Sequence, residues 1–500
     1  MSFWSLDVVA ALLLGAGYGM LFGAIPGLTV TLALALFIPV GLFMEPGLLL
    51  PALVGITAMG IFASDIGNVL VKVPGTPASA AYTEELYEIS RERSVAYALG
   101  VASLPSAVGS LIGVGFLVGG TVLLARLAKQ FSSFEVFWLV LLGVSTGVLG
   151  ASPFWKSVLA FGVGMLLGTV GYDPALGMPR FTFGRELLLG GFDFIVALVG
   201  LFGVGEVLST VWKGTGWRDV SVPAGPRGNV AREYFVETWR LMFEKRRLVL
   251  RSALLGLFVG FLPGAGSDFA AWVCSNIERV RGGKKEEVAL AGTTANNASI
   301  AGDWVPALSL GIPGDTLTAI ILGMFISLGI TPGPMLFERH WDWVVNLYGA
   351  FLVASVVLMP LGGYVAAYAV SWIARVPRPV LMSAVLGVCV VGVYAVNNNP
   401  EDLYVAAGFG ALGWLLRAGG FPVGQVVLGL VLGPLLERSF LVSMIKTRWD
   451  LLSFFHRPLA VGLAVANVIV VGTVAWYRWQ REKGNGKRWG EREAVPGESG

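Results

Sequence analysis

The sequence predicts an all-α polytopic membrane protein whose transmembrane segments form two repeated halves, with helices broken at Pro-Gly pairs. The first observation is composition: 55% of the 500 residues are hydrophobic and 13% are charged, against about 25% charged in a soluble protein. The second is that apolar stretches of about 20 residues, long enough to cross a bilayer, recur along nearly the whole chain. The third is that Pro-Gly pairs recur at matching places in the two halves.

The apolar stretches predict roughly 10–14 transmembrane helices, because several stretches are short or interrupted. They cover residues 7–24, 28–44, 48–71, 95–125, 134–150, 155–171, 192–212, 249–275, 286–302, 304–330, 343–372, 380–396, 402–436 and 459–477. The separation of 286–302 from 304–330 rests on Asp303, since a charged residue is unusual inside a membrane helix.

The basic residues predict how the chain is oriented. Segment 213–251 holds nine Lys and Arg residues against four acidic ones, and the tail after Trp479 is also basic. By the positive-inside rule both regions are expected in the cytoplasm, and the N-terminus outside. No Lys or Arg precedes Lys72, so the first apolar stretch is expected to be a retained helix and not a cleaved signal peptide.

These features predict five regions. They are a first transmembrane half (1–212), a basic cytoplasmic linker (213–251), a second half (252–458), a C-terminal transmembrane helix (459–480) and a cytoplasmic tail (481–500).

Within the linker, residues 230–247 predict an amphipathic helix on the membrane surface. A solvated linker helix is the alternative. The apolar residues expected on one side of this helix are Tyr234, Phe235, Trp239, Met242 and Phe243.

Two pairs of Pro-Gly motifs indicate the internal repeat. Each first-half motif has a second-half counterpart 237 or 239 positions later, with flanking glycines in the first pair. The pairs are Pro26-Gly27 with Pro263-Gly264, and Pro74-Gly75 with Pro313-Gly314. Interrupted segments at corresponding places in two halves indicate the binding site of a secondary transporter. The alternative is that each Pro-Gly pair forms a tight loop at the membrane surface.

The residues after two of these breaks predict helices that restart within the membrane. Thr76 and Asp315 are favourable N-cap residues, and Pro77 suits a first helical position. A restarted helix directs free backbone N–H groups and a positive dipole end at the break. Two such ends that face each other would form a carboxylate-binding site without a fixed positive charge.

Buried acids and amides provide the other candidate site residues. Asp315 is either a plain N-cap or an ion-coupling group, and Asp65 and Asp268 present the same choice. A carboxylate repels an anionic substrate, so coupling to Na⁺ or H⁺ fits these residues better than substrate contact. Asn296 and Asn297 are either substrate contacts or interhelical hydrogen-bond partners.

Other functional classes have little support in the sequence. Two cysteines and two histidines offer few ligands for a metal or haem, and no phosphate- or nucleotide-binding motif is present. We therefore expect no enzymatic activity, no cofactor and no nucleic-acid partner. One alternative is an intramembrane aspartyl protease that uses Asp173 and Asp315, and another is an uncoupled channel or structural subunit.

Motifs along nearly the full length resemble the large membrane subunit of the tripartite tricarboxylate transporters (TctA-type). The resembling stretches are residues 23–39, 73–81, 171–184, 200–208, 260–266, 295–302, 310–323, 329–337 and 421–437. The resemblance implies a cation-coupled carboxylate permease of the bacterial inner membrane. It also implies two partners, which are a small membrane subunit (TctB-type) and an extracytoplasmic solute-binding protein (TctC-type).

Carried over position by position, the resemblance implies a substrate site built from the break residues and the two amides. These are Pro26, Gly27, Pro74, Gly75, Thr76, Pro77, Ser79, Pro263, Gly264, Asn296, Asn297, Pro313 and Gly314. Asp65, Asp268 and Asp315 depart from the family pattern, which has small residues there. The departures leave open a less anionic ligand, a different coupling ion or a paralogue that acts without the usual partners.

Overall fold

Nearly all the regular structure of the described residues is helical, as the sequence predicts. The computed structural model describes residues 4–25, 28–150, 153–173, 177–213, 229–264, 266–373 and 378–473. Strands in these ranges form one short antiparallel hairpin, β1 (Gly171–Tyr172) with β2 (Pro179–Arg180). Six helical segments of the described chain are long and apolar enough to cross a membrane, and shorter apolar helices accompany them.

The first half is a series of helices with two interruptions near its start. The elements are α1 (Leu6–Ala24), α2 (Val30–Gly41), α3 (Pro46–Val71), η1 (Ser79–Ala81), α4 (Thr83–Glu92), α5 (Val95–Ala128), α6 (Ser133–Gly150), α7 (Phe154–Gly168), η2 (Glu186–Leu188), α8 (Phe194–Leu198), η3 (Val199–Val204) and α9 (Gly205–Lys213).

The second half repeats this plan after a short linker. The linker elements are η4 (Arg232–Glu237) and α10 (Thr238–Glu244). The second-half elements are α11 (Arg246–Phe261), α12 (Gly266–Val280), α13 (Lys285–Leu310), α14 (Thr316–Ser327), α15 (Pro334–Arg339), α16 (Trp341–Val353), η5 (Ala354–Leu358), α17 (Met359–Ile373), α18 (Arg378–Asn397), α19 (Asp402–Ala418) and α20 (Val423–Lys446). After η6 (Leu451–Phe455) comes a last apolar helix, Pro458–Thr473.

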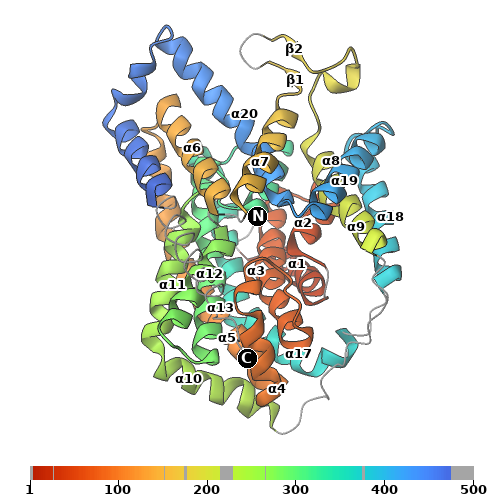
Figure 1. Ribbon diagram of the computed structural model, residues 1–500, viewed down its shortest axis with the longest axis vertical. Helices are drawn as coiled ribbons and strands as arrows, with labels where there is room; N and C mark the ends of the chain where they lie inside the picture. Colours follow the sequence, from red (N-terminus) through yellow and green to blue (C-terminus); the bar gives the residue numbers. More distant parts are fainter. Residues whose placement is uncertain are drawn as a thin grey trace, which may run out of the picture.

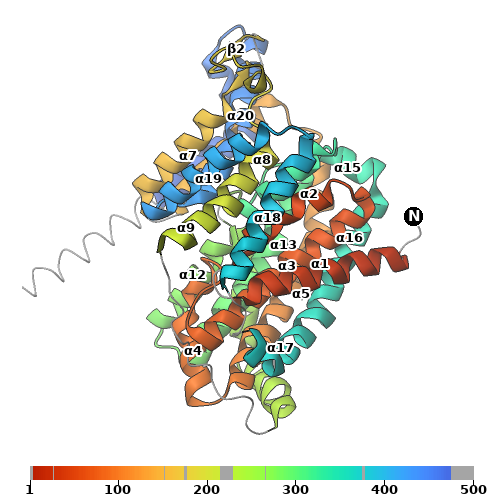
Figure 2. The ribbon, with the colours of Figure 1, turned by 90° about the vertical axis from the view of Figure 1, so that its right-hand side faces the viewer.

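The helices form an elongated bundle with two distinct ends. Helices α4 and α10 lie at one end, and the β1–β2 hairpin lies at the other (Figure 1). A perpendicular view shows the same two ends, with α17 also near the end that carries α4 (Figure 2). We refer to the end that carries α4 and α10 as the α4 end.

Helix α1 packs parallel to α3 because glycines of α1 let the two backbones meet. A Cβ atom on Gly19 would collide with the carbonyl oxygen of Ile56, and one on Gly23 with that of Gly60. Small residues allow this close approach in membrane helices. Helix α2 then runs back along α3, since Gly60 lies against Val30 while Gly41 lies against Leu49. Helices α1 and α2 therefore form a re-entrant hairpin whose tip lies beside the middle of α3.

The second half contains the matching hairpin. A Cβ on Gly256 would lie 2.5 Å from the carbonyl oxygen of Ala295, and one on Gly260 would collide with that of Ser299. Helix α11 is therefore parallel to α13, and α12 returns along α13, with the Ser275 hydroxyl beside Gly292. The hairpin of α11 and α12 thus has its tip beside the middle of α13.

The two halves are inverted with respect to each other. Helix α3 ends next to α4, where the Lys72 ammonium pairs with Glu84 at 2.5 Å. Its counterpart α13 begins next to α4, where Lys285 pairs with Glu88 at 2.5 Å. Equivalent helices therefore run in opposite directions, and the two hairpins enter from opposite ends of the bundle.

Helix α13 corrects one predicted boundary. Residues 286–302 and 304–330 were expected to be separate segments, but α13 continues through Asp303, whose side chain is buried. One aspartate lowers helix propensity only slightly. The helix instead ends at Gly311, which has φ 69° and supplies the left-handed cap that ends many helices.

Two other predicted segments, 249–275 and 402–436, each correspond to two helices. These are α11 with α12, and α19 with α20.

The linker helix does not present one apolar side. Tyr234 is fully buried, and its hydroxyl bonds the Ser103 side chain and donates to the Pro360 carbonyl at 2.9 Å. Trp239 and Phe243 are exposed. The segment is thus anchored into the bundle by Tyr234. Residues 214–228 of the linker and the predicted tail, 481–500, lie outside the described residues.

Candidate functional site

A buried carboxyl group, Asp65, lies at the centre of the most enclosed polar cluster near the breaks. Its side chain is fully buried in α3. The Tyr82 hydroxyl lies 3.0 and 3.3 Å from its two oxygens, and the Asn68 amide nitrogen donates to it at 3.1 Å. Among the described residues no Lys or Arg pairs with Asp65. Burying an unpaired charge is costly, so a bound proton or cation would favour this arrangement.

The cluster extends from the first half into the second. The Asn296 side chain of α13 donates its amide N–H to the Tyr82 hydroxyl at 3.0 Å. Asn296 is fully buried, and its amide oxygen has no hydrogen-bond partner. Buried polar atoms are nearly always paired. This oxygen can therefore bind a cation, or accept a hydrogen bond if the protons of the cluster rearrange.

The Pro74-Gly75 break folds back along α3 and positions Tyr82. A Cβ on Gly75 would lie 2.7 Å from the Cβ of Ser64. Thr76 and Ser79 then cap each other, since the Ser79 N–H donates to Thr76 Oγ1 at 3.1 Å and the Thr76 N–H donates to Ser79 Oγ at 3.2 Å. Asn68 donates to the Ser79 carbonyl at 3.3 Å.

The restart after this break differs from the sequence prediction. Thr76 was expected to start a helix directly, but the chain forms a turn and the three-residue η1 before α4. The first half therefore does not provide a long helix whose dipole end faces the break. The Trp272 side chain of α12 donates to the carbonyl of Pro77 at 3.1 Å, so the second-half hairpin contacts this loop.

After the Pro313-Gly314 break a helix restarts, as predicted. Asp315 caps α14: its Oδ1 accepts the Thr318 N–H at 2.8 Å, and the Thr318 hydroxyl accepts the Asp315 N–H at 2.9 Å. The prediction that Asp315 is an N-cap is confirmed. Its carboxylate occupies the N-terminal end of α14, where an anion would otherwise bind.

The Pro313-Gly314 break and Asp315 after it pack against the end of the α11–α12 hairpin and against α13. A Cβ on Gly266 would lie 2.8 Å from the Cβ of Asp315, and one on Gly314 would lie 2.8 Å from Oδ1 of Asp303. The Thr146 hydroxyl of α6 donates to the carbonyl of Pro263. Gly264, at φ 77°, lies against the α6 backbone. The predicted residues Pro263, Gly264, Pro313 and Gly314 therefore lie in one region.

The two amides of the predicted site, Asn296 and Asn297, have different hydrogen-bond partners. Asn297 faces α5, where its amide donates to the Ser106 hydroxyl at 2.8 Å. This contact is the interhelical hydrogen bond that the sequence offered as an alternative, and Asn296 alone reaches the Asp65 cluster. Pro26 and Gly27 lie outside the described residues, as does the side chain of Asp268.

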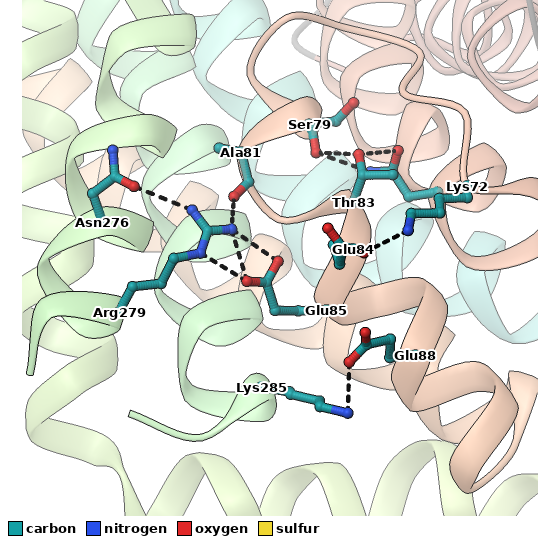
Figure 3. Close-up of polar contacts among 11 residues, drawn as sticks. Lys72, Ser79, Ala81, Thr83, Glu84, Glu85, Glu88, Asn276, Arg279 and Lys285 are labelled. Atoms are coloured by element: carbon teal, nitrogen blue, oxygen red, sulfur yellow. Dashed lines mark hydrogen bonds and ion pairs between the residues drawn. The ribbon is translucent and has the colours of Figure 1, made fainter. Parts of the chain in front are cut away.

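Ion pairs fasten α4 to the second half beside this cluster (Figure 3). Arg279 of α12 donates through its Nε to Glu85 Oε1 at 2.8 Å. It also donates to the Ala81 carbonyl, which is next to Tyr82. Lys285 pairs with Glu88 and Glu92. The Lys72 ammonium, hydrogen-bonded to Glu84, lowers the pKa of that carboxyl. The turn that carries Tyr82 is thus held between α3 and charged contacts to α12 and α13.

A comparison with protein families identifies this architecture. The sequence profile of the tripartite tricarboxylate transporter TctA family matches residues 9–428. The chain belongs to the tripartite tricarboxylate transporter TctA family. The resemblance that the sequence motifs indicated is therefore confirmed.

Two relatives of this chain come from Agrobacterium vitis. One, named an uncharacterized 52.8 kDa protein in the TAR-I ttuC' 3' region, is 30% identical over 488 residues, which cover 94% of each chain. The other, named an uncharacterized protein in the TAR-II ttuC' 3' region, is 31% identical over 229 residues, covering 43% of this chain and 92% of the relative. No solved structure matches the chain significantly.

Sequence reasoning missed several residues of this TctA-family site. Asp303 was read only as a boundary; at the repeat spacing of 239 positions it is the counterpart of Ser64, as Gly314 is the counterpart of Gly75. Its place beside the second Pro-Gly break is a signal that could have identified it. Tyr82 and Asn68 gave no comparable signal, because a tyrosine before a charged helix and a lone asparagine are common. Only the fold brings them to Asp65.

The chemistry open to the cluster is that of small cations and neutral polar groups. No group of three or more metal-ligating side chains occurs within the part of the chain that the structure describes. The cluster offers one carboxyl group, one hydroxyl and two amides, of which Asn296 has an unpaired oxygen. It can hold a proton at Asp65, or a monovalent cation between oxygens, inside a protein core closed to bulk water.

Proposed function

We propose that this large subunit is the permease of a cation-coupled secondary transporter that imports organic acids, tricarboxylates or other carboxylates, by alternating access. The observation that supports it most is the pair of inverted re-entrant hairpins, whose described ends lie against the middle of α3 and α13, the helices that carry Asp65 and Asn296. Inverted repeats with interrupted helices around a central site are the arrangement of many secondary transporters.

Coupling to a cation is part of the proposal. Asp65 is a fully buried carboxyl group that only neutral groups contact among the described residues. Carriers use intramembrane carboxyl groups to bind H⁺ or Na⁺. Asp315, by contrast, has a complete structural role as the cap of α14. We therefore assign coupling to Asp65 before Asp315, and leave Asp268 as a further candidate.

We derive the orientation from the distribution of basic residues, and the partners from the family. The linker η4–α10 belongs to the basic segment and lies at the α4 end (Figure 1), so we place the α4 end and the C-terminus in the cytoplasm. The membrane proposed is the bacterial inner membrane. We propose that a small TctB-type membrane subunit and an extracytoplasmic TctC-type binding protein complete the transporter, and that the binding protein delivers the solute.

The test is uptake by the reconstituted complex. Radiolabelled mono-, di- and tricarboxylates would each be offered with an inward Na⁺ gradient, an inward H⁺ gradient or no gradient. Accumulation of one acid above its external concentration, under one gradient only, is the expected result. Omitting the binding protein is the control, and should reduce the uptake rate.

The alternatives give different results. An uncoupled channel would equilibrate a solute under every gradient and would not concentrate it. A protease would cleave membrane peptides, but Asp173 of the proposed acid pair lies in the β1–β2 hairpin, where it pairs with Arg180 at 3.3 Å. Failure to concentrate any acid with the complex intact would overturn the proposed function.

A further inference from the structure

We propose that Tyr82 is a positioning residue that links Asp65 in the first half to Asn296 in the second, through a hydrogen-bond chain whose direction reverses when Asp65 binds a proton. This inference rests on the transport function proposed above, and it names the proton as the coupling ion. Tyr82 keeps its own proton throughout and acts through Asp65 and Asn296.

The geometry provides two hydrogen bonds in series across the two halves. Asp65 lies on α3, Tyr82 directly before α4 and Asn296 on α13, and all three side chains are fully buried. The Tyr82 oxygen is 3.0 Å from Asp65 Oδ1 and 3.0 Å from the Asn296 amide nitrogen. Both distances are in the normal range for hydrogen bonds. The chain is therefore continuous from one half to the other.

With Asp65 ionised, only one direction of this chain is possible. A carboxylate accepts hydrogen bonds and donates none, and a tyrosine hydroxyl has a single hydrogen to donate. Tyr82 must then donate to Asp65, and its oxygen accepts the N–H from Asn296. The Asn296 oxygen is left without a partner, which is the arrangement that the structure contains.

With Asp65 protonated, the direction reverses. One proton from solution forms an O–H bond on Asp65, and no other bond is made or broken. Asp65 can then donate to the Tyr82 oxygen, and the Tyr82 hydroxyl turns its hydrogen toward Asn296. The Asn296 amide rotates by half a turn and accepts that hydrogen through its oxygen, and its NH2 group takes the place that the oxygen had. Protonation in the first half thereby exchanges an acceptor for a donor on the far side of the Asn296 amide.

This reversal gives the second half a way to respond to the proton. Unpaired buried polar atoms destabilise the state that contains them, so the two protonation states of Asp65 favour different surroundings for Asn296: a donor facing its oxygen when Asp65 is ionised, and an acceptor facing its NH2 group when Asp65 is protonated. Tyr82 is also next to the Ala81 carbonyl that Arg279 of α12 contacts. The turn that carries Tyr82 is thus connected to both α12 and α13, the elements that must move for alternating access.

Within the described part of the chain, Tyr82 is the titratable group in hydrogen-bond contact with Asp65. The other charged and titratable side chains on elements packed against α3 have partners elsewhere or lie in end turns. They are Asp7 and Tyr18 (α1), Lys72 (end of α3), Glu84, Glu85, Tyr87, Glu88, Arg91 and Glu92 (α4), Tyr97 and Arg126 (α5), Lys285, Glu286, Glu287 and Asp303 (α13), Asp342 and Tyr348 (α16), and Tyr364 and Tyr368 (α17).

The first test is the pH profile of uptake by the reconstituted complex carrying Tyr82→Phe. Loss of the Tyr82 hydroxyl removes a donor to the ionised form of Asp65, so the ionised form becomes less stable. The midpoint of the profile should move upward by about one to two pH units, and gradient-driven accumulation should fall. The control is Tyr234→Phe, which removes another fully buried hydroxyl with two partners and should leave the midpoint unchanged.

The second test is a double-variant comparison. Asn296→Ala should change the midpoint when Tyr82 is present, and should change it no further in the Tyr82→Phe background, because the hydroxyl is the connection. Asn297→Ala is the control, since this neighbouring amide bonds Ser106 and not Tyr82. Additive shifts from the two changes would overturn the inference.

The outcomes separate this inference from the proposed function. If the wild-type complex concentrates an acid but Tyr82→Phe keeps the wild-type midpoint, the inference fails and the transport function stands. The same holds if only a Na⁺ gradient drives uptake, independent of pH. If the wild type concentrates nothing, the proposed function fails first. Should Tyr82→Phe not assemble, an unchanged midpoint in Asn296→Ala overturns the inference.

Discussion

The two halves share a helical plan but use their buried carboxyl groups differently. In the first half, Asp65 is contacted by Tyr82 and Asn68 and is joined through Tyr82 to the other half. In the second half, Asp303 lies 2.8 Å from where a Cβ of Gly314 would be, at the base of the capped helix α14. Asp65 thus belongs to a polar cluster that connects both halves, while Asp303, the counterpart of Ser64 in the repeat, lies at a helix junction.

The comparison separates the helix packing that the two halves share from the local structure in which they differ. The glycines of α1 recur in α11 after 237 positions, and the residues of α3 that they contact recur in α13 after 239. The restarts after the second breaks do not recur: a turn and η1 lead into α4 in the first half, and a directly capped α14 follows in the second. Packing is therefore common to both halves, while the cluster of Asp65, Asn68 and Tyr82 is specific to the first.

The largest effect is expected at the repeated glycine contacts. Gly19→Leu and Gly256→Leu place a side chain against the backbone of Ile56 or Ala295, and overpacking of this kind costs about 1–3 kcal/mol or more. Both variants should lose most of the folded protein, as measured by size-exclusion chromatography and thermal unfolding in detergent. Gly17→Leu is the control, because nothing lies within 4 Å of its Cβ position. Loss in one half only would show that the packing is not equivalent.

A smaller effect is expected from the ion pair that holds α4. Arg279→Glu places two acids together and should lower stability by about 1–2 kcal/mol, since Glu85 is only 12% exposed in its side chain and Arg279 35%. It should also slow uptake several-fold, because α4 carries the Tyr82 turn. Combining it with Glu85→Arg should recover part of both losses. The absence of any recovery would mean that the pair does not act as a unit.

The smallest effect is expected at Asp315. Asp315→Asn keeps a side chain that can cap α14, so the thermal midpoint should change little, whereas Asp315→Ala should lose about 1 kcal/mol. The ion dependence of uptake should be unchanged in both, because coupling is assigned to Asp65. A loss of ion dependence in Asp315→Asn would give the second half a coupling carboxyl of its own, and would remove the asymmetry described above.

The sequence predicted what is encoded locally. Composition and apolar length predict the helical membrane fold, Pro-Gly pairs predict the breaks, and Asp315 after the second break predicts the cap of α14. Each of these depends on residues within one helix or one turn. The inversion of the halves was not predictable, because it depends on which helix ends meet at α4, and the loose count of spans left the direction of each helix open.

The centre of the site was the least predictable part. Asp65 was singled out as an acid in an apolar stretch, but Tyr82 and Asn296 are joined to it only by the packing of α3, the η1 turn and α13. Asn296 and Asn297 are indistinguishable by sequence, and helix rotation decides that one faces Tyr82 and the other Ser106. Asp303 was misassigned as a boundary, because a single residue between apolar runs does not reveal whether it ends a helix.

The most direct test of the account compares Asp65→Asn with Asp303→Asn in the reconstituted complex. Both the accumulation of an acid under an ion gradient and its gradient-free exchange across the membrane would be measured. We predict that Asp65→Asn exchanges the acid but no longer concentrates it, while Asp303→Asn retains coupling in whatever fraction folds. Gradient-driven accumulation by Asp65→Asn at the wild-type level would contradict the assignment of coupling to the first half.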